Sequence, residues 1–126
     1  MKRKWTFEDV RRIGLTLPGV EETATYGAPS LKVRGKMLAC PATNRSAEPG
    51  SIVVRVSIDQ REALIAEAPE IYYVTEHYVK YPSVLVRLAN MNEDALRGLL
   101  RMSLQFVTRK ILSDKRGVRK PGPPRR

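Results

Sequence analysis

Cysteine and histidine are almost missing from this chain of 126 residues, which has one of each, Cys40 and His77. A single cysteine excludes an internal disulfide and a cysteine-based zinc cluster, and it fits a reducing cytoplasm. A single histidine leaves little material for catalysis or metal binding, because the neighbouring Glu76 would point to the opposite face of a strand. We therefore expect no catalytic residue, no metal site and no cofactor.

Long apolar runs are also missing. No stretch approaches the roughly 18 apolar residues of a membrane span, and the charged start MKRKW leads into TFEDVRRIG, which lacks a signal-peptide core. We expect a soluble, cytoplasmic protein, and we favour a monomer. Its 42% apolar and 29% charged residues are ordinary for a globular domain, and a chain of this length can bury one core.

Acidic residues are scarce at the ends of the chain rather than throughout it. Residues 2–4 contribute +3 and residues 109–126 contribute +7 of the net charge of +10, so the body between them is neutral. Past Ser113 the sequence is rich in glycine, proline and basic residues. We predict one domain over residues 1–113 and a mobile basic tail over residues 114–126.

Hydrophobic periodicity predicts the order of elements. A first helix begins near Phe7, with Thr6 as its N-cap, Asp59 caps a short second helix, and Asn92 caps a long third helix. Period-two runs predict four strands between residues 22 and 56, joined as a meander, and two more between residues 71 and 88. This order favours a two-layer α+β domain, with an antiparallel sheet and the N- and C-terminal helices packed on one face.

A set of short motifs resembles the MmcQ/YjbR family of small bacterial proteins, whose fold is similar to that of the frataxin homologue CyaY. The matching residues are Pro18, Gly19, Gly27, Pro29, Gly35, Lys36, His77, Tyr78 and Tyr81. The chain departs from the family pattern at Glu76, Lys80 and Ser83, where members usually have proline, a small residue and tryptophan. The resemblance implies the same fold, and a DNA-binding role has been suggested for members of the family.

A frataxin-like fold suggests iron binding, but we do not expect it here. The resemblance to frataxins implies that iron would bind at an acidic surface ridge of carboxylates, the hard oxygen ligands that iron favours. The first helix of this chain offers Glu8 and Asp9 but continues with Arg11 and Arg12. We therefore predict no acidic ridge.

Basic residues of the predicted sheet suggest a surface for an anionic partner. If Leu31 and Val33 face the helices, then the cations that alternate with apolar residues share an uncovered sheet face, and Gly35 adopts positive φ in a basic turn. The candidate nucleic-acid-binding residues are Lys32, Arg34, Lys36, Arg55, Lys80, Arg87, Lys115, Arg116, Arg119 and Lys120. Such a face would contact phosphates without reading sequence.

Three interpretations of these residues stay open. The first is a DNA-binding or general nucleic-acid-binding protein. The second is a non-catalytic module that binds an acidic protein or a small ligand through the open sheet face and the His77–Tyr81 hairpin. The third is structural: the cations are simply solvated, while Tyr78 and Tyr81 pack on the sheet with their hydroxyls bonded to nearby backbone.

Overall fold

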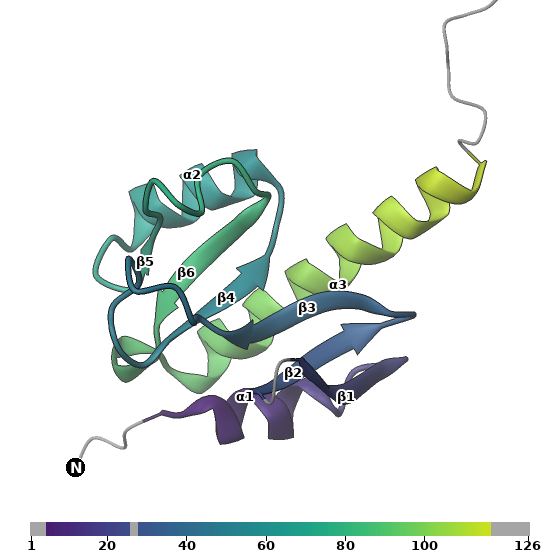
Figure 1. The fold of residues 1–126 in the computed structure, drawn as a ribbon, viewed down its shortest axis with the longest axis horizontal. Helices are drawn as coiled ribbons and strands as arrows, with labels where there is room; N and C mark the ends of the chain where they lie inside the picture. The colour runs from purple at the N-terminus through teal and green to yellow at the C-terminus, as the bar shows by residue number, and fades with distance from the viewer. Residues whose placement is uncertain (1–4, 26–27, 117–126) are drawn as a thin grey trace, which may run out of the picture.

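The computed structural model describes residues 5–25 and 28–116 (Figure 1). In chain order the elements are α1 (Phe7–Gly14), β1 (Val20–Thr25), β2 (Ala28–Val33), β3 (Lys36–Pro41), β4 (Ser51–Arg55), α2 (Ile58–Glu67), β5 (Tyr72–Tyr73), β6 (Ser83–Arg87), a 3-10 turn η1 (Leu88–Asn90) and α3 (Glu93–Arg116). The predicted α+β fold is confirmed.

The strands form one antiparallel sheet in the order β1-β2-β3-β4-β6-β5. The first four make the predicted meander, and β6 inserts between β4 and β5. At the β2–β3 turn, Arg34 and Gly35 both have positive φ, +50° and +79°. That combination is typical of a two-residue hairpin turn, whose twist matches the flanking strands.

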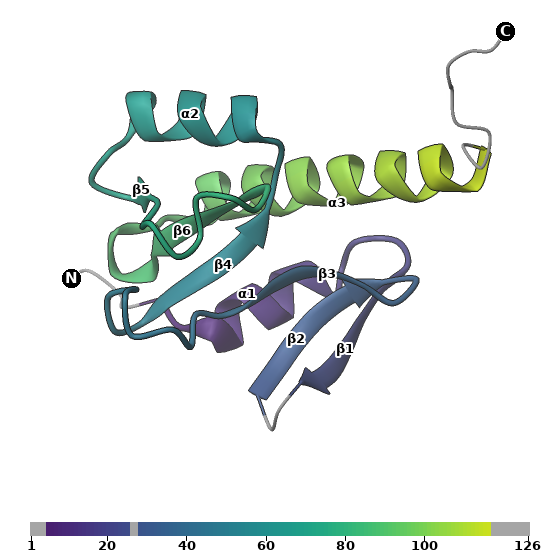
Figure 2. The ribbon, with the colours of Figure 1, turned by 45° about the horizontal axis from the view of Figure 1, so that its top comes forward.

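The helices α1 and α3 cover one face of the sheet (Figures 1 and 2). The long α3 crosses β2, β3 and β4, and α1 lies beside it against β2. Between these layers lies a core of buried residues that includes Ile13, Leu31, Leu38, Ile52, Val54, Val86, Leu96 and Leu100. The remaining helix, α2, contacts β5 and β6, and Leu64 at its inner face shares a hollow with Ala95 and Met102 of α3.

The second face of the sheet is not open over β4 and β6, which corrects the expectation of an uncovered face. Val53 and Leu85 alternate with the core residues of their strands, yet they are only 6% and 0% exposed. Two connecting loops, residues 42–50 and 74–82, meet across this face, where the Tyr78 hydroxyl accepts a hydrogen bond from a backbone N–H of the first loop. The alternation of polar and apolar residues along these strands therefore did not indicate a solvent-exposed face of the sheet.

The ends of the helices agree with the sequence in two cases and differ in two. Thr6 is the N-cap of α1, and the Asn92 side chain accepts a hydrogen bond from the N–H of Ala95 at the start of α3. The cap of α2 is Ser57 rather than Asp59, because the Ser57 hydroxyl and the Gln60 side chain each accept the other's backbone N–H at 3.0 Å. At the other end α3 continues to Arg116, past the predicted start of the tail at residue 114.

Candidate functional site

The 74–82 loop carries His77, Tyr78 and Tyr81 between β5 and β6. Tight turns shape it: the N–H groups of Tyr78 and Val79 both donate to the carbonyl of Thr75 at 2.9 Å. Further along, the N–H of Tyr81 donates to the carbonyl of Tyr78. The loop is thus an ordered part of the fold.

Arg61 of α2 holds this loop against the sheet. Its side chain is only 3% exposed, and one terminal nitrogen donates to the carbonyls of Val79, Tyr81 and Ser83 at 3.2, 3.1 and 3.4 Å. A guanidinium is suited to this role because its donors lie in a fixed plane and stay charged. Sequence reasoning missed Arg61, and the only local signal was the capping pattern SIDQ, which places this residue one turn into a helix.

A pocket of about 390 Å³ lies under the loop, on the second face of the sheet. It is lined by Met37, Val53, Arg55, His77, Tyr78, Tyr81, Pro82 and Ser83. We call it the loop pocket. It therefore unites the histidine and both tyrosines of the family motif with one of the predicted cations.

The aromatic side chains of the loop pocket differ in burial. His77 and Tyr78 meet edge to face, with ring centroids 4.8 Å apart. Tyr78 is half-buried, and its hydroxyl accepts a hydrogen bond from the N–H of Asn44 at 3.3 Å, as the structural interpretation predicted. Tyr81 is 56% exposed, so the prediction that its ring packs on the sheet is wrong. Its ring forms an outer wall instead.

Arg55 lies where the sheet splits. Backbone pairing between β3 and β4 ends at Ala39 and Val54, whereas β4 stays paired with β6 as far as Arg55. On the other side of the split, the carbonyl of Leu38 accepts a hydrogen bond from the buried Ser103 hydroxyl of α3. Arg55 lines the loop pocket, and its guanidinium carbon lies 5.9 Å from the ring centroid of Phe106 on α3.

The Arg55 guanidinium has no hydrogen-bonding partner among the described residues. Its Nε is buried without an acceptor, and no carboxylate of the described residues forms an ion pair with it. A buried polar group without a partner costs roughly 1–3 kcal/mol. The fold therefore keeps a half-buried cation unneutralised beside an aromatic pocket.

Arg87, in contrast, is fully engaged. Its guanidinium makes two hydrogen bonds of 2.8 Å to the Glu48 carboxylate, donates to the carbonyl of Pro69 at 2.9 Å and lies 4.1 Å from the Tyr73 ring centroid. The hydrogen bond from Arg87 lowers the pKa of Glu48. Nothing in the sequence marked Glu48 as this partner, which lies 39 residues away along the chain.

The predicted cations do not share one face. Lys32 pairs in register with Met37, so it stands on the side of the loop pocket, but Arg34 lines a separate hollow beside α3 with Leu104 and Thr108. Strand alternation fails at Arg34 because this residue belongs to the turn, with its left-handed backbone. Arg87 lies at the far end of β6, paired in register with the first residue of β4.

Three lysines lie at the same end of the strands as the loop pocket, and we call them the basic rim: Lys32, Lys36 and Lys80. Lys36 and Lys80 are exposed, and Lys80 precedes the pocket-lining Tyr81, whereas Lys36 pairs in register with the core residue Val33 and so faces the helix side of β3. Among the described residues, none of the three forms an ion pair, although Glu21 lies opposite Lys32 on β1. The structure thus brings part of the predicted cation set together with the family motif.

Other motif and tail residues lie elsewhere. Pro18 and Gly19 line the hollow that holds Arg34, and Pro29 is exposed on β2. Lys115 and Arg116 belong to the last turn of α3. Gly27, Arg119 and Lys120 lie outside the described residues.

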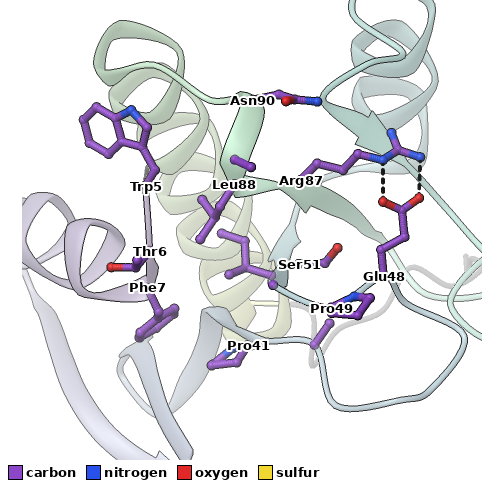
Figure 3. A pocket seen from close by; sticks show the side chains of 14 residues that line it. Trp5, Thr6, Phe7, Pro41, Glu48, Pro49, Ser51, Arg87, Leu88 and Asn90 are labelled. Atoms are coloured by element: carbon purple, nitrogen blue, oxygen red, sulfur yellow. Dashed lines mark hydrogen bonds and ion pairs between the residues drawn. The ribbon is translucent and has the colours of Figure 1, made fainter. Parts of the chain in front are cut away.

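A larger hollow of about 590 Å³ opens at the opposite end of the strands (Figure 3). Trp5 and Phe7 form one side of it, and Pro49 and the Arg87–Glu48 ion pair form the other. The charges there already neutralise each other. The loop pocket is smaller, but it contains the cation without a partner, so it is the stronger candidate for binding an anion.

Neither a metal cluster nor a membrane span is seen in the part of the chain that the structure describes. No three His, Cys, Asp or Glu side chains gather there in a way that could hold a metal ion. No helix in residues 5–25 and 28–116 is long and apolar enough to cross a membrane.

Comparisons with known proteins agree with the motif resemblance. The family model YjbR matches residues 15–105. Two uncharacterized proteins, from Mycobacterium tuberculosis and Mycobacterium bovis, are each 38% identical over 109 residues, which cover 75% of this chain and 82% of theirs. A crystal structure of a Deinococcus radiodurans protein with the domain DUF419 superposes with a TM-score of 0.67 and 25% identity, over 87% of this chain and 84% of that one.

Proposed function

The chain belongs to the YjbR family, and from that premise we propose that it is a non-catalytic, cytoplasmic protein that binds nucleic acid through one basic end. The observation that carries the proposal is the distribution of ion pairs. Among the described residues, the cations at one end of the strands form no ion pair, whereas at the other end Arg87 is paired and Arg45 alone is not.

The paired cations include Arg87, held by Glu48 at the end of β6, and Arg97, held by Glu93 in the first turns of α3. The unpaired cations include the basic rim and Arg34, which lies beside the later turns of α3. Those turns continue into Arg109 and Lys110, which are exposed and form no ion pair among the described residues. Among the described residues, these cations at one end of the molecule form no ion pair, although Glu21 lies opposite Lys32.

A phosphate backbone is a suitable partner for such an end. Each phosphate that a lysine or arginine neutralises releases counterions, which gives affinity that depends on salt and not on base sequence. The cations lie on a turn, on a loop and on a helix that the core holds in place, so their spacing is fixed before binding. An acidic protein would satisfy the same charges, and the test must separate the two partners.

The test is binding of a random-sequence 20-base-pair DNA duplex, and of one of its strands, followed by fluorescence anisotropy at low salt. Removing two rim charges in the double variant Lys36→Gln, Lys80→Gln should weaken binding by about tenfold, since each lost contact removes counterion release. The control Arg45→Gln, Arg97→Gln removes the same charge away from the rim, and it should weaken binding by less than about threefold.

Equal loss in the two double variants would mean that net charge alone drives binding and would contradict the basic end. Absence of binding by the intact chain at low salt would reject nucleic acid as the partner, and a module that binds protein or a small ligand would take its place. Binding of an acidic protein surface would then be measured with the same variants.

A further inference from the structure

From the geometry of the loop pocket we propose that it is a binding site for a small planar carboxylate, held flat between aromatic side chains with its charge on Arg55. The proposal does not depend on nucleic-acid binding. It rests on a cation without a partner, on the shape and lining of the pocket, and on the anchoring of the loop.

Arg55 provides the positive charge of the proposed site. Arg55 Nε is buried without an acceptor, and the two terminal nitrogens of the guanidinium make no hydrogen bond among the described residues either. Unlike Nε, these terminal nitrogens are not enclosed by protein atoms. They present two parallel N–H donors, which match the two oxygens of a carboxylate.

The walls define the rest of the ligand. Met37, Val53 and Pro82 provide apolar surface, while the rings of Tyr78 and Tyr81 provide aromatic surface. Aromatic rings favour stacked or edge-to-face contact with a planar group. A cavity of about 390 Å³ falls within the range of small-molecule sites, which is roughly 300–1,000 Å³.

A carboxylate fits better than a free phosphate. The lining has one guanidinium, and its other polar side-chain groups are the hydroxyls of Tyr78, Tyr81 and Ser83 and the ring of His77. One cation matches the single charge of a carboxylate, whereas a phosphate dianion would need a second cation inside the pocket. The lysines of the basic rim are neighbours of lining residues and do not line the pocket themselves.

The site is formed before the ligand arrives. Arg61 fixes three carbonyls of the segment from Val79 to Ser83, and the bond from Asn44 to Tyr78 ties the loop to the rest of the second face. Preorganised walls avoid the entropic cost of ordering a loop on binding. Tyr81, 56% exposed, is the ring that a ligand would cover.

The experiment uses the full-length, nitrogen-15-labelled chain and 2-naphthoate as the probe, with binding followed by amide chemical shifts. We expect saturable shifts at Val53, His77 and Ser83. Arg55→Met should weaken binding by about tenfold or more, and Arg55→Lys, which keeps the charge but loses the planar fork, by about threefold. The control Arg101→Met removes an exposed arginine of α3 outside the pocket and should leave the affinity unchanged.

Two further probes separate charge from shape. Uncharged naphthalene-2-carboxamide should bind the wild type about tenfold more weakly than 2-naphthoate, and inorganic phosphate at equal concentration should not reproduce the shifts. The proposal is overturned if 2-naphthoate causes no saturable shift at these amides, or if both Arg55 variants bind it as tightly as the wild type. Equal affinity for the carboxamide, or the same shifts from phosphate alone, would overturn it as well. If Arg55→Met does not fold, Arg55→Lys decides.

Discussion

Arg61 is the residue on which the shape of the 74–82 loop depends most. It is 3% exposed and serves three backbone carbonyls. Arg61→Met keeps most of the buried volume but leaves those carbonyls without their donor, so we expect the free energy of unfolding to fall by about 2–3 kcal/mol in a urea melt. Faster amide exchange at Tyr81 and Ser83 should accompany it.

The control for this prediction is Glu62→Gln. It removes the Arg61–Glu62 ion pair, in which the Glu62 side chain is 63% exposed, and should change stability by less than about 0.5 kcal/mol. Equal effects of the two substitutions would mean that the ion pair, and not the hydrogen bonding to the carbonyls, is what Arg61 contributes.

The ion pair between Glu48 and Arg87 predicts a pH dependence. Hydrogen bonding from Arg87 lowers the pKa of Glu48 in the folded state, so the pair stabilises the fold above the unfolded pKa of about 4.3. This stabilisation is lost as the pH falls through the lower, folded-state pKa. The difference in urea midpoint between the wild type and Glu48→Gln should therefore be present near neutral pH and vanish in strong acid.

A suitable control for the pH series is Glu70→Gln. The Glu70 carboxylate is exposed and forms no ion pair among the described residues. Its substitution should leave the same midpoint difference from the wild type at every pH. A difference for Glu48→Gln that persists unchanged in strong acid would show that the contact with Arg87 does not depend on the ionised carboxylate.

At the scale of elements, the contact between α1 and β2 depends on a glycine. A Cβ at Gly14 would lie 2.4 Å from Cδ1 of Leu31, a side chain with 0% exposure. Alanine has a higher helix propensity than glycine, but the steric overlap with Leu31 should outweigh this gain. We therefore expect Gly14→Ala to lower the free energy of unfolding by about 1–3 kcal/mol. At Gly98, in α3, nothing lies within 4 Å of such a Cβ. Gly98→Ala should therefore raise the free energy of unfolding by up to about 1 kcal/mol.

The two glycine substitutions are read in the same thermal or urea melt. Stabilisation by both would show that Leu31 moves aside at little cost and that α1 does not sit tightly on β2. Destabilisation by both would point to a cause other than the space around each glycine.

Local patterns predicted the elements well and their covering loops poorly. Alternation in β4 and the apolar stripe of α3 follow directly from the geometry of strand and helix, so both were predicted. The cap of α2 was misplaced because Asp59 and Ser57 are both good caps, and only the reciprocal bond with Gln60 decides between them. The bond between Tyr78 and Asn44 joins residues 34 positions apart, and no local pattern encodes it.

The candidate site shows the same contrast between what local sequence patterns predict and what long-range packing decides. The histidine and tyrosines of the 74–82 loop stood out in the sequence, and so did Arg55. Their meeting in one pocket depends on where the pairing of β3 with β4 stops, at Ala39 and Val54. That position is set by how α3 passes behind the split, which is a property of the packed molecule.

For the whole molecule, the last prediction concerns the tail. Residues 117–126 add four cations, Arg119, Lys120, Arg125 and Arg126, to those of the basic end. On duplex DNA the logarithm of the binding constant falls by about 0.9 per neutralised phosphate for each unit of log salt, so a chain that ends at Arg116 should show a slope shallower by up to about 3.6. Backbone contacts carry no sequence information, so the ratio of affinities for two unrelated duplexes should not change.

Anisotropy titrations of both chains across a salt series provide the measurement. An unchanged slope would show that the tail does not contact the DNA. A changed affinity ratio would show that the tail reaches the bases, which a purely electrostatic contact with phosphates cannot do.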